Sequence, residues 1–404
     1  MTTPLSPQTI AIVKATVPAL AQYGTAITTA MYRRLFEDAH IRALFNHSNQ
    51  GEGGAQVNAL AAAILAYAQN IENLGALAPA VERIAYKHIG YHILPEHYPY
   101  VATALLGAIK EVLGDAASDE ILSAWGEAYW FLAEILKARE AVIRAELETV
   151  TGGWTGWRTF EVTDKRKESE VITSFVLRPT DGRPVLRHNP GQYLTFRLNA
   201  PGQPELKRNY SISNAPNSDH YRISVKREAA GKGGSRYLHD MIKVGDLLEA
   251  TPPAGDFYLA EAPKRPVVLL SGGVGLTPMI SIAETIAELH PTLETHFVHG
   301  TQNSDTHALG KHVRALAERH GAMSVAAFYN EPKPQDVVGQ THDVTGVITI
   351  DWLKSNVPLD EADIYLCGPK PFLRALVSGL SLAGVDPDRI HYEFFGPADE
   401  LLAA

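Results

Sequence analysis

Hydrophobic side chains recur at helical spacing through the first third of the chain. Over residues 6–147 the apolar positions fall on one face of successive helices, and the breaks carry residues typical of helix ends, namely Ser6-Pro7, Gly24, Gly75 and Gly114. This pattern predicts about six helices and no strands. Residues 149–157 are rich in glycine and contain Trp154 and Trp157, which predicts a linker whose rings pack against a neighbouring domain.

The spacing changes to a period of two after the linker. Apolar and polar positions alternate over residues 171–177, 193–198 and 221–225, which predicts a small antiparallel barrel. From residue 266 short apolar runs alternate with helical segments that begin at Pro278 and Ala308, which predicts an open, mostly parallel α/β sheet. We therefore expect a multidomain fold of class α plus β plus α/β. Its parts are a helical domain at 1–148, the linker at 149–157, a barrel at 158–262 and an α/β domain at 263–404.

Composition narrows the class of partner. The chain has 404 residues, 45% of them hydrophobic, and a net charge of -9. It carries no cluster of Lys and Arg, so nucleic acid and an anionic membrane are poor partners, and we expect small molecules, a monomer and no required protein partner. The one cysteine cannot form an internal disulfide. Residues 1–7 lack the apolar core of a signal peptide. The longest apolar stretch, 59–68, is too short to span a bilayer. We therefore expect a cytoplasmic protein with no obligatory membrane.

A Gly-rich turn joins a strand to a helix in the predicted α/β domain. Gly272-Gly273-Val274-Gly275 follows the apolar run 267–271, and Thr277-Pro278 opens the helix. Glycines let the backbone approach a ligand, and a helix N-terminus offers free N–H groups to a diphosphate. Pro278 stands where the G-x-G-x-x-G fingerprint has its third glycine, and such a turn is by itself as often only a tight connection.

Other motifs favour a nucleotide site. A predicted barrel strand begins with Arg208-Asn209-Tyr210-Ser211. Its arginine can pair with a phosphate, and its tyrosine can lie against a flat ring. The alternative is a surface arginine beside an ordinary strand tyrosine. Together with Gly191-Gln192-Tyr193, Gly233-Gly234-Ser235 and Tyr365-Leu366-Cys367-Gly368-Pro369, the order resembles the ferredoxin-NADP reductase family, whose barrel binds FAD and whose α/β domain binds the nicotinamide nucleotide.

This resemblance implies two groups of cofactor contacts. FAD would be held by Tyr193, Arg208, Asn209, Tyr210 and Ser211. The nicotinamide dinucleotide would be held by Gly273, Val274, Gly275, Leu276, Thr277 and Pro278, with Cys367, Gly368 and Pro369 near the nicotinamide. Cys367 is alternatively a small buried filler. Asn209 stands where members of the family often have glutamine, which leaves the phosphate-binding logic intact.

One histidine lies on an apolar helix face in the first domain. Val81, Ile84, Ala85, His88 and Ile89 share that face, so His88 points toward the core. A lone core histidine is most often satisfied by a hydrogen bond, and the pair formed with His92 has a spacing that could chelate zinc. Three further histidines are expected at the surface, namely His40, His47 and His97.

The residues around His88 resemble the globin part of flavohaemoglobins. The matching segments, in order, are Tyr32-Arg33-Arg34-Leu35-Phe36, Leu44-Phe45-Asn46, Gln56 with Leu60, Lys87-His88, Pro95-Glu96-His97-Tyr98 and Ala138-Arg139-Glu140. The reductase half and the ending His391-Tyr392-Glu393-Phe394-Phe395-Gly396-Pro397 extend the resemblance over essentially the whole chain.

The flavohaemoglobin resemblance implies a role for each matching residue. His88 would be the proximal ligand of the iron of haem b, next to Lys87, with Tyr98 and Glu140 hydrogen-bonded around it to make the imidazole a stronger electron donor. The alternative for Tyr98 and Glu140 is an ordinary bond between helices. Tyr32, Gln56 and Leu60 would line the distal side, Phe45 would pack on the haem edge, and Phe394, Phe395, Gly396 and Pro397 would cover the flavin.

The implied activity is that of a nitric oxide dioxygenase, which oxidises nitric oxide with O2 to nitrate at a haem that NADH or NADPH reduces through FAD. Two alternatives are a sensor globin whose reductase only keeps the haem ferrous, and a reductase for external acceptors. The segment after the strand at 294–298, His299-Gly300-Thr301-Gln302-Asn303, has no arginine for a 2'-phosphate, which favours NADH.

Overall fold

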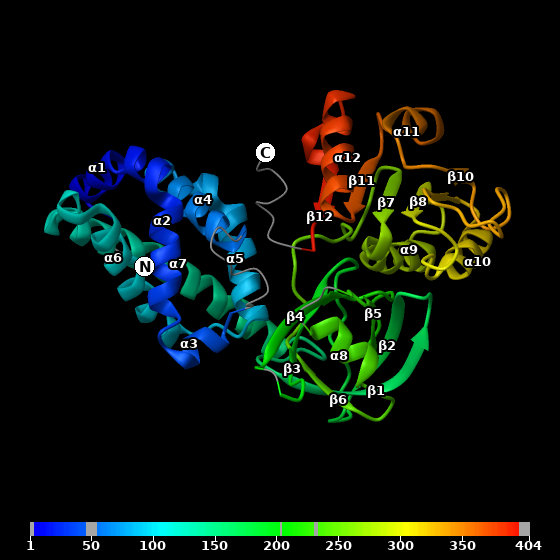
Figure 1. The fold of residues 1–404 in the computed structure, drawn as a ribbon, viewed down its shortest axis with the longest axis horizontal. Coiled ribbons are helices and arrows are strands. Elements are labelled where there is room, and N and C mark those ends of the chain that lie inside the picture. Colours follow the sequence, from blue (N-terminus) through cyan, green and yellow to red (C-terminus); the bar gives the residue numbers. More distant parts are fainter. Residues whose placement is uncertain (1–3, 46–54, 203, 230–232, 396–404) are drawn as a thin grey trace.

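The computed structural model describes residues 4–45, 55–202, 204–229 and 233–395. Its first part is helical, and Figure 1 shows these helices as a body of their own beside two sheet-containing bodies. The helices are α1 (Pro7–Ala15), α2 (Val17–Leu35), α3 (Ala39–Ala43), α4 (Ala55–Gln69), α5 (Ala78–Gly90), α6 (Tyr98–Leu113) and α7 (Asp119–Thr149). No strand occurs among the described residues of this part, as predicted. Ser6 caps α1 by accepting a hydrogen bond from the Thr9 amide at 3.0 Å, which explains the start at Ser6-Pro7.

The helical body is held together by one apolar stripe per helix. On α2 the buried residues Ile27, Met31 and Leu35 follow each other at four-residue spacing, and Ala104 and Ala108 do the same on α6. Small alanines on α6 let the two helices approach closely. These residues belong to one hydrophobic cluster, so the periodic pattern of the sequence gives the core directly.

The second part is an antiparallel sheet of six strands in the order β4-β3-β6-β1-β2-β5. The strands are β1 (Arg158–Lys167), β2 (Ile172–Pro179), β3 (Tyr193–Leu198), β4 (Leu206–Ser211), β5 (Tyr221–Lys226) and β6 (Leu247–Ala250), with one helix, α8 (Gly234–Asp240). A bridge between Ile212 and Ile223 links the two edges of the sheet and closes it into the predicted barrel.

The third part is a parallel sheet in the order β10-β9-β8-β7-β11-β12. Its strands are β7 (Val267–Gly272), β8 (Thr295–Thr301), β9 (Met323–Tyr329), β10 (Val344–Thr345), β11 (Asp363–Cys367) and β12 (Ile390–Glu393). Its helices are α9 (Leu276–Leu289), α10 (Gly310–His320), α11 (Ile350–Asn356) and α12 (Lys370–Leu382), which lie on both faces of the sheet in Figure 1. The order reverses beside β7, which is the topological switch point where open α/β sheets bind ligands.

The linker packs on the barrel through both of its tryptophans. Trp154 is buried, and its indole N–H donates to the Ala250 carbonyl at 3.3 Å. The ring of Trp157 faces two cations, the Arg197 guanidinium at 5.0 Å and the Lys207 ammonium at 5.6 Å. The connection between the helical body and the barrel is therefore fixed by side-chain packing, as the sequence predicts.

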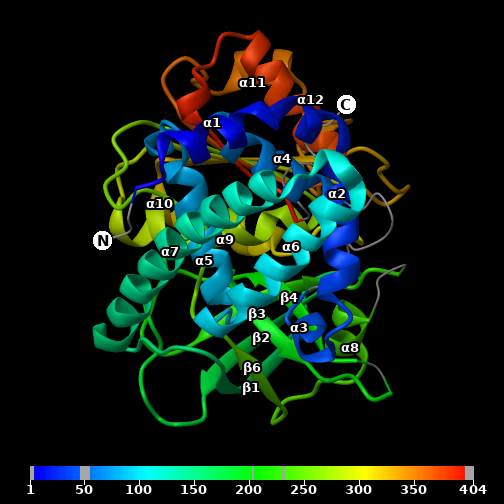
Figure 2. The same ribbon diagram turned by 90° about the vertical axis from the view of Figure 1, so that its left-hand side faces the viewer.

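A second contact joins α5 directly to the barrel. The Thr251 hydroxyl donates to the carbonyl of Gly90 at 2.9 Å, and Arg83 pairs with Asp256 at 2.8 Å. A Cβ on Gly90 would lie 3.1 Å from Thr195 Oγ1, so the end of α5 packs tightly on the barrel. Figures 1 and 2 both place α5 on the side of the helical body that faces the barrel.

Among the described residues no single helix is long and apolar enough to cross a membrane. The bent pair α1 and α2, with 67° between the two helices, meets that test on length and composition alone.

Replacing Asp181 by Asn should lower the free energy of unfolding of the barrel by about 2 kcal/mol. The Asp181 carboxylate accepts two hydrogen bonds from Arg158, at 2.7 and 3.1 Å, and this guanidinium is almost fully buried. The substitution leaves a buried cation without a charged partner. The carboxylate itself is 34% exposed, which keeps the expected loss below that for a fully buried pair.

The loss in the Asp181→Asn variant should depend on pH. The hydrogen bond from Arg158 holds the pKa of Asp181 well below its ordinary 3.8, against the opposing effect of burial. A lowered carboxyl pKa gives stability that is full above the ordinary pKa and is lost as the pH falls through the folded-state pKa. Urea unfolding followed by tryptophan fluorescence should show the largest difference from the parent near neutral pH and a smaller one below about pH 4. Asp164→Asn, in an exposed pair with Arg166, is the matched control and should change stability by less than about 0.5 kcal/mol.

Candidate functional site

His88 lies on α5 at the centre of a hydrogen-bonded trio. Its Nδ1 lies 2.7 Å from Glu140 Oε1 and 3.1 Å from the Tyr98 hydroxyl, and that hydroxyl donates to the same carboxylate oxygen at 2.5 Å. Because a carboxylate only accepts, the ring proton is assigned to Nδ1. Both hydrogen bonds that described residues make to the ring are at Nδ1, so Nε2 is the nitrogen that can bind a metal. The trio thus fits a haem iron whose proximal ligand is His88.

The carboxylate in this trio is fully buried. Glu140 lies on α7 and Tyr98 opens α6, so the packing of three helices brings the trio together. Burial and the hydrogen bond to Glu140 raise the pKa of Tyr98, which therefore stays protonated and acts as a donor. The cation Arg144 stands 3.6 Å from the other carboxylate oxygen, Glu140 Oε2. The charge of Glu140 is thus screened little by water and acts on the imidazole at short range.

The zinc alternative is not supported. His92 follows the C-terminus of α5, which ends at Gly90, so the helical i, i+4 geometry between His88 and His92 is lost. Among the described residues, no group of three or more His, Cys, Asp or Glu side chains could hold a metal. The surface prediction for His97 was wrong, because its ring is buried and caps the backbone by accepting from the Leu94 amide at 3.0 Å. His40 is exposed, and His47 lies outside the described residues.

The predicted distal residues lie on α2, on α4 and after α3. Tyr32 is buried on α2 and packs against two aromatic rings, Phe36 at 5.4 Å and Phe45 at 5.9 Å between centroids. Phe45 and Leu60 are partly buried and border the same hydrophobic cluster. Gln56 falls on α4, but its side chain lies outside the part of the chain that the structure describes.

On the barrel, two neighbouring strands carry the predicted flavin residues. In the register of β3 and β4, Tyr193 faces Ser211, and Asn209 and Ser211 lie on the side of β4 opposite to Arg208 and Tyr210. A Cβ on Gly234 would lie 2.9 Å from Arg208 Cγ and 3.4 Å from the Tyr210 hydroxyl, so the backbone at Gly234 lies directly against these two side chains. The first turn of α8 thus brings its N–H groups beside a guanidinium, an arrangement that suits a phosphate group.

Gly234 was missed as a site residue. Its only sequence signal was the triplet Gly233-Gly234-Ser235, which served to set the order of the motifs. A helix as short as α8 has too little periodicity to be predicted from hydrophobic pattern.

In the α/β domain the two predicted nucleotide loops meet at the switch point. A Cβ on Gly275 would collide with the Cys367 carbonyl and would lie 2.7 Å from the amide nitrogen of Gly368, while one on Gly272 would lie 3.0 Å from Pro369. The loops follow β7 and β11, which are hydrogen-bonded neighbours.

The glycine turn itself is compact and leads straight into α9. Gly273, Val274 and Gly275 form a short 3-10 turn, and Leu276, Thr277 and Pro278 form the first turn of α9, where the Thr277 hydroxyl donates to the Val274 carbonyl at 3.1 Å. Proline is tolerated there because the first N–H groups of a helix have no partner within it. The backbone amides of this turn are therefore available to a diphosphate.

Cys367 is completely buried, and burial raises the pKa of its thiol well above the ordinary value. It therefore stays a protonated thiol that packs beside the glycine turn, as in the buried-filler alternative.

The last strand brings a further residue to this place. Glu393 pairs in register with Cys367, and burial, with Asp256, raises its pKa to about 7, against the opposing charge of Lys87. Lys87 lies on α5 and Asp256 on the loop after β6, so charges from the other two bodies of the chain act on Glu393. Glu393 could not be singled out from the sequence, because a lone glutamate in a terminal strand carries no distinct signal. Phe394 and Phe395 follow it, whereas Gly396 and Pro397 lie outside the described residues.

Comparisons with known proteins match each of the three bodies. The chain matches the family models described as Globin over residues 29–136, Oxidoreductase FAD-binding domain over 159–258 and Oxidoreductase NAD-binding domain over 269–378. It is 59% identical to the flavohemoprotein of Xylella fastidiosa (strain 9a5c) over the whole of both chains. It is 45% identical to that of Rhizobium meliloti (strain 1021), covering 97% of this chain and 98% of the relative.

Two solved structures are similar. The flavohemoglobin of Malassezia yamatoensis with bound FAD and heme has a TM-score of 0.86 at 25% identity, covering 98% of this chain and 100% of that one. The FAD/NAD binding domain of the nitric oxide dioxygenase of Vibrio cholerae O1 biovar El Tor has a TM-score of 0.54 at 40% identity, covering 59% of this chain and 99% of that one.

A Gly275→Ala substitution should weaken binding of the nicotinamide dinucleotide and leave flavin content unchanged. The added methyl group overlaps the backbone of Cys367, so the two loops must separate and the glycine turn loses its shape. The NADH concentration that half-saturates flavin bleaching should rise on the order of tenfold. Gly126→Ala on α7 is the control, because its methyl group meets only Leu106 Cδ1 at 3.7 Å. An unchanged NADH dependence in the Gly275 variant would show that the turn does not hold the dinucleotide.

Proposed function

The chain belongs to the flavohemoprotein family, and from this we propose that it is a nitric oxide dioxygenase that protects the cell from nitrosative stress. It oxidises nitric oxide with O2 to nitrate, using NAD(P)H as the source of electrons. When bound, haem would supply the iron at which O2 and nitric oxide react, and FAD would accept one two-electron hydride and pass its electrons on one at a time. The similarity to the Vibrio cholerae nitric oxide dioxygenase over the reductase half supports this activity.

The trio around His88 carries the proposal. A carboxylate at 2.7 Å from Nδ1 gives the imidazole anionic character and makes it a strong donor through Nε2, which favours O–O chemistry over simple storage. A protein that only bound O2 or nitric oxide would not need a fully buried glutamate, which is costly to bury without its hydrogen bonds. Tyr98 holds the same carboxylate oxygen at 2.5 Å and fixes its orientation.

The remaining site residues have the following proposed roles. Tyr32 donates its hydroxyl hydrogen to developing negative charge on the distal side, in a pocket shared with Gln56 and Leu60. Phe45 packs on the haem edge. Tyr193, Arg208, Asn209, Tyr210 and Ser211 hold FAD, Gly273 through Pro278 hold the dinucleotide, and the segments 367–369 and 394–397 lie on either side of the reacting rings. Lys87 places a cation on α5, and its charge partly offsets the rise in the pKa of Glu393 that burial causes.

We further propose domain boundaries at 148/149, 157/158 and 262/263, a monomeric state and a cytoplasmic location. The linker and barrel contacts of Trp154 and Trp157 support the first two boundaries. The single cysteine, which is buried, suits a reducing compartment. NADH is the proposed donor, because residues 299–303, at the end of β8 and just after it, contain no arginine that could bind a 2'-phosphate.

The proposal can be tested with the full chain loaded with haem and FAD. An anaerobic visible spectrum before and after NADH, and again after CO, should show bleaching of the flavin and a ferrous–CO haem spectrum. When nitric oxide is then added in air, the reduced protein should consume it and form an equal amount of nitrate. Full haem reduction with slow nitric oxide consumption would favour the sensor, and flavin bleaching without any haem band would favour a reductase for external acceptors.

Glu140→Gln should slow nitric oxide consumption on the order of tenfold while haem content stays the same. The amide is neutral, so the imidazole of His88 becomes a weaker donor although Tyr98 can still hydrogen-bond. The iron–histidine stretching frequency of the ferrous protein should fall, because it reports this bond directly.

The control for Glu140→Gln lies on the same helix. Glu134→Gln removes an exposed carboxylate that pairs with Lys137 at 2.7 Å, and it should change neither quantity. If the Glu140 variant consumed nitric oxide at the parental rate and its iron–histidine stretching frequency were unchanged, the proposed role of the trio would be wrong.

A further inference from the structure

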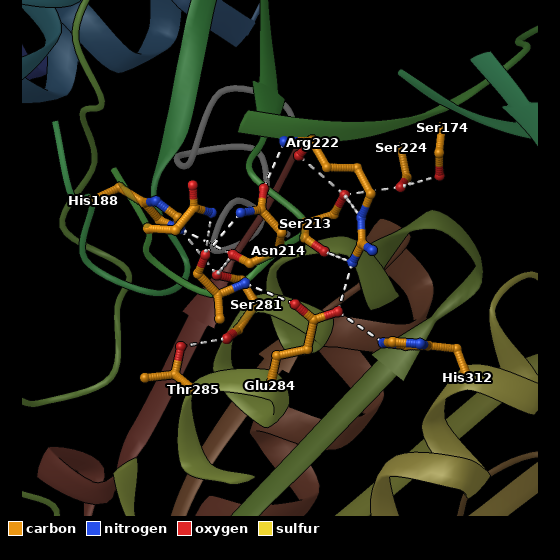
Figure 3. A network of polar contacts seen from close by, with 12 residues as sticks. Ser174, His188, Ser213, Asn214, Arg222, Ser224, Ser281, Glu284, Thr285 and His312 are labelled. Atoms are coloured by element: carbon orange, nitrogen blue, oxygen red, sulfur yellow. Dashed lines mark hydrogen bonds and ion pairs between the residues drawn. The ribbon is translucent and has the colours of Figure 1, made fainter. Parts of the chain in front are cut away.

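A buried polar network joins the barrel to the α/β domain, away from both predicted cofactor motifs. Figure 3 shows Glu284 of α9 at its centre, between Arg222 of β5 and His312 of α10. Glu284 Oε1 accepts from Arg222 Nη2 at 2.8 Å and from His312 Nε2 at 2.7 Å. Its other oxygen, Oε2, accepts from the backbone amide of Ala215 at 2.7 Å. Both oxygens of the Glu284 carboxylate therefore accept hydrogen bonds, two at Oε1 and one at Oε2.

The network is largely shielded from solvent. The Glu284 and Arg222 side chains are 13% and 19% exposed. Burial alone would raise the pKa of Glu284, but the hydrogen bond from His312 and the charge of Arg222 outweigh it and lower the pKa. The carboxylate is thus ionised at neutral pH, and its ion pair with Arg222 crosses between domains in a setting of low dielectric.

A second set of bonds crosses the same boundary one turn earlier on α9. Ser281 donates to the carbonyl of Asn214 at 2.8 Å, and the same carbonyl accepts from His188 Nε2 at 3.1 Å. Since a carbonyl only accepts, His188 carries its proton on Nε2, and burial lowers its pKa to about 3, so it is neutral. Two side chains of α9, Ser281 and Glu284, therefore hydrogen-bond to the backbone of the loop that follows β4.

The network links the two predicted cofactor motifs through short stretches of chain. Asn214 and Ala215 come three and four residues after Ser211, the last residue of the predicted flavin motif. Ser281 and Glu284 lie on the helix that begins directly after the glycine turn at 273–275. A rotation of the α/β domain against the barrel would break these bonds and would move the glycine turn relative to Ser211.

We propose that Glu284 is a positioning residue for hydride transfer, because it fixes the dinucleotide-binding helix α9 on the flavin barrel in one orientation. This inference rests on the proposed function only as far as reduction of FAD by NADH. Hydride transfer needs the donor and acceptor atoms within close reach and aligned, so a small loss of orientation lowers the rate without removing binding. Glu284 itself touches neither reacting ring.

The test is anaerobic stopped-flow mixing of the holoprotein with NADH, followed by flavin bleaching. In Glu284→Gln the limiting rate at saturating NADH should fall on the order of tenfold, because the amide cannot accept from all three donors. The half-saturating NADH concentration and the flavin content should stay near those of the parent. The thermal midpoint will fall because Arg222 loses its charged partner, so the rates are compared well below the midpoint of the variant. Such a split between limiting rate and half-saturation would not follow from a general loss of structure.

Two control variants sharpen the test. Glu288→Gln changes an exposed glutamate one turn further on α9 and should leave flavin bleaching unchanged. His312→Leu removes a bond within the α/β domain and keeps the contacts of Glu284 to Arg222 and Ala215, so its limiting rate should stay much nearer to the parent than that of Glu284→Gln.

Ser281→Ala serves where Glu284→Gln loses flavin or fails to fold. It removes the crossing contacts of the Ser281 hydroxyl with Asn214 and His188 and should lower the limiting rate in the same manner but less. A parental limiting rate in the folded Glu284→Gln and Ser281→Ala variants would overturn the proposal. Because flavin bleaching is read before any nitric oxide is added, this result is independent of whether nitric oxide is the substrate.

Discussion

The buried carboxylate of Glu140 is the interaction on which the helical domain depends. A charge that is removed from water is stable only when nearby donors and opposite charges replace the water. Here His88 and Tyr98 bind Oε1 from two other helices, and the Arg144 guanidinium stands 3.6 Å from Oε2. The same bonds assign the proton of His88 to Nδ1 and leave Nε2 for the proposed bond to iron. One requirement, that a buried charge be hydrogen-bonded, thus sets the packing of α5, α6 and α7 and also the electronic character of the proposed ligand.

The helix that carries His88 also joins the helical domain to the barrel. Its last residue, Gly90, packs tightly against Thr195, and its carbonyl accepts from Thr251 at 2.9 Å. The hydrogen bond contributes about 1 kcal/mol, so the close fit of the surfaces matters more than this single bond. Because His88 is only two residues away, the contact fixes the proximal side of the haem site relative to the flavin barrel.

Much of this could be predicted from the sequence because periodic patterns and spaced motifs are local. The helical domain, β3 at 193–198 and the glycine turn at 272–275 follow from patterns within a few residues. Gly234, Glu393 and Glu284 could not be predicted, because each acquires its role from partners distant in the chain, such as Arg208, Cys367 and Arg222. His97 was placed at the surface for the same reason: its burial depends on tertiary packing that a loop sequence does not reveal.

The barrel contacts its two neighbouring domains through different kinds of interaction, and each kind suits the reaction that takes place across that contact. Toward the helical domain the contact is close backbone packing at Gly90, supported by an exposed ion pair between Arg83 and Asp256. Toward the α/β domain it is a buried ion pair within a network of directional bonds around Glu284. Electron transfer to a haem depends mainly on how closely two groups approach, whereas hydride transfer also depends on alignment. A joint that sets proximity can therefore rest on packing, while a joint that sets angle requires bonds with direction, and the charge at Glu284 supplies them.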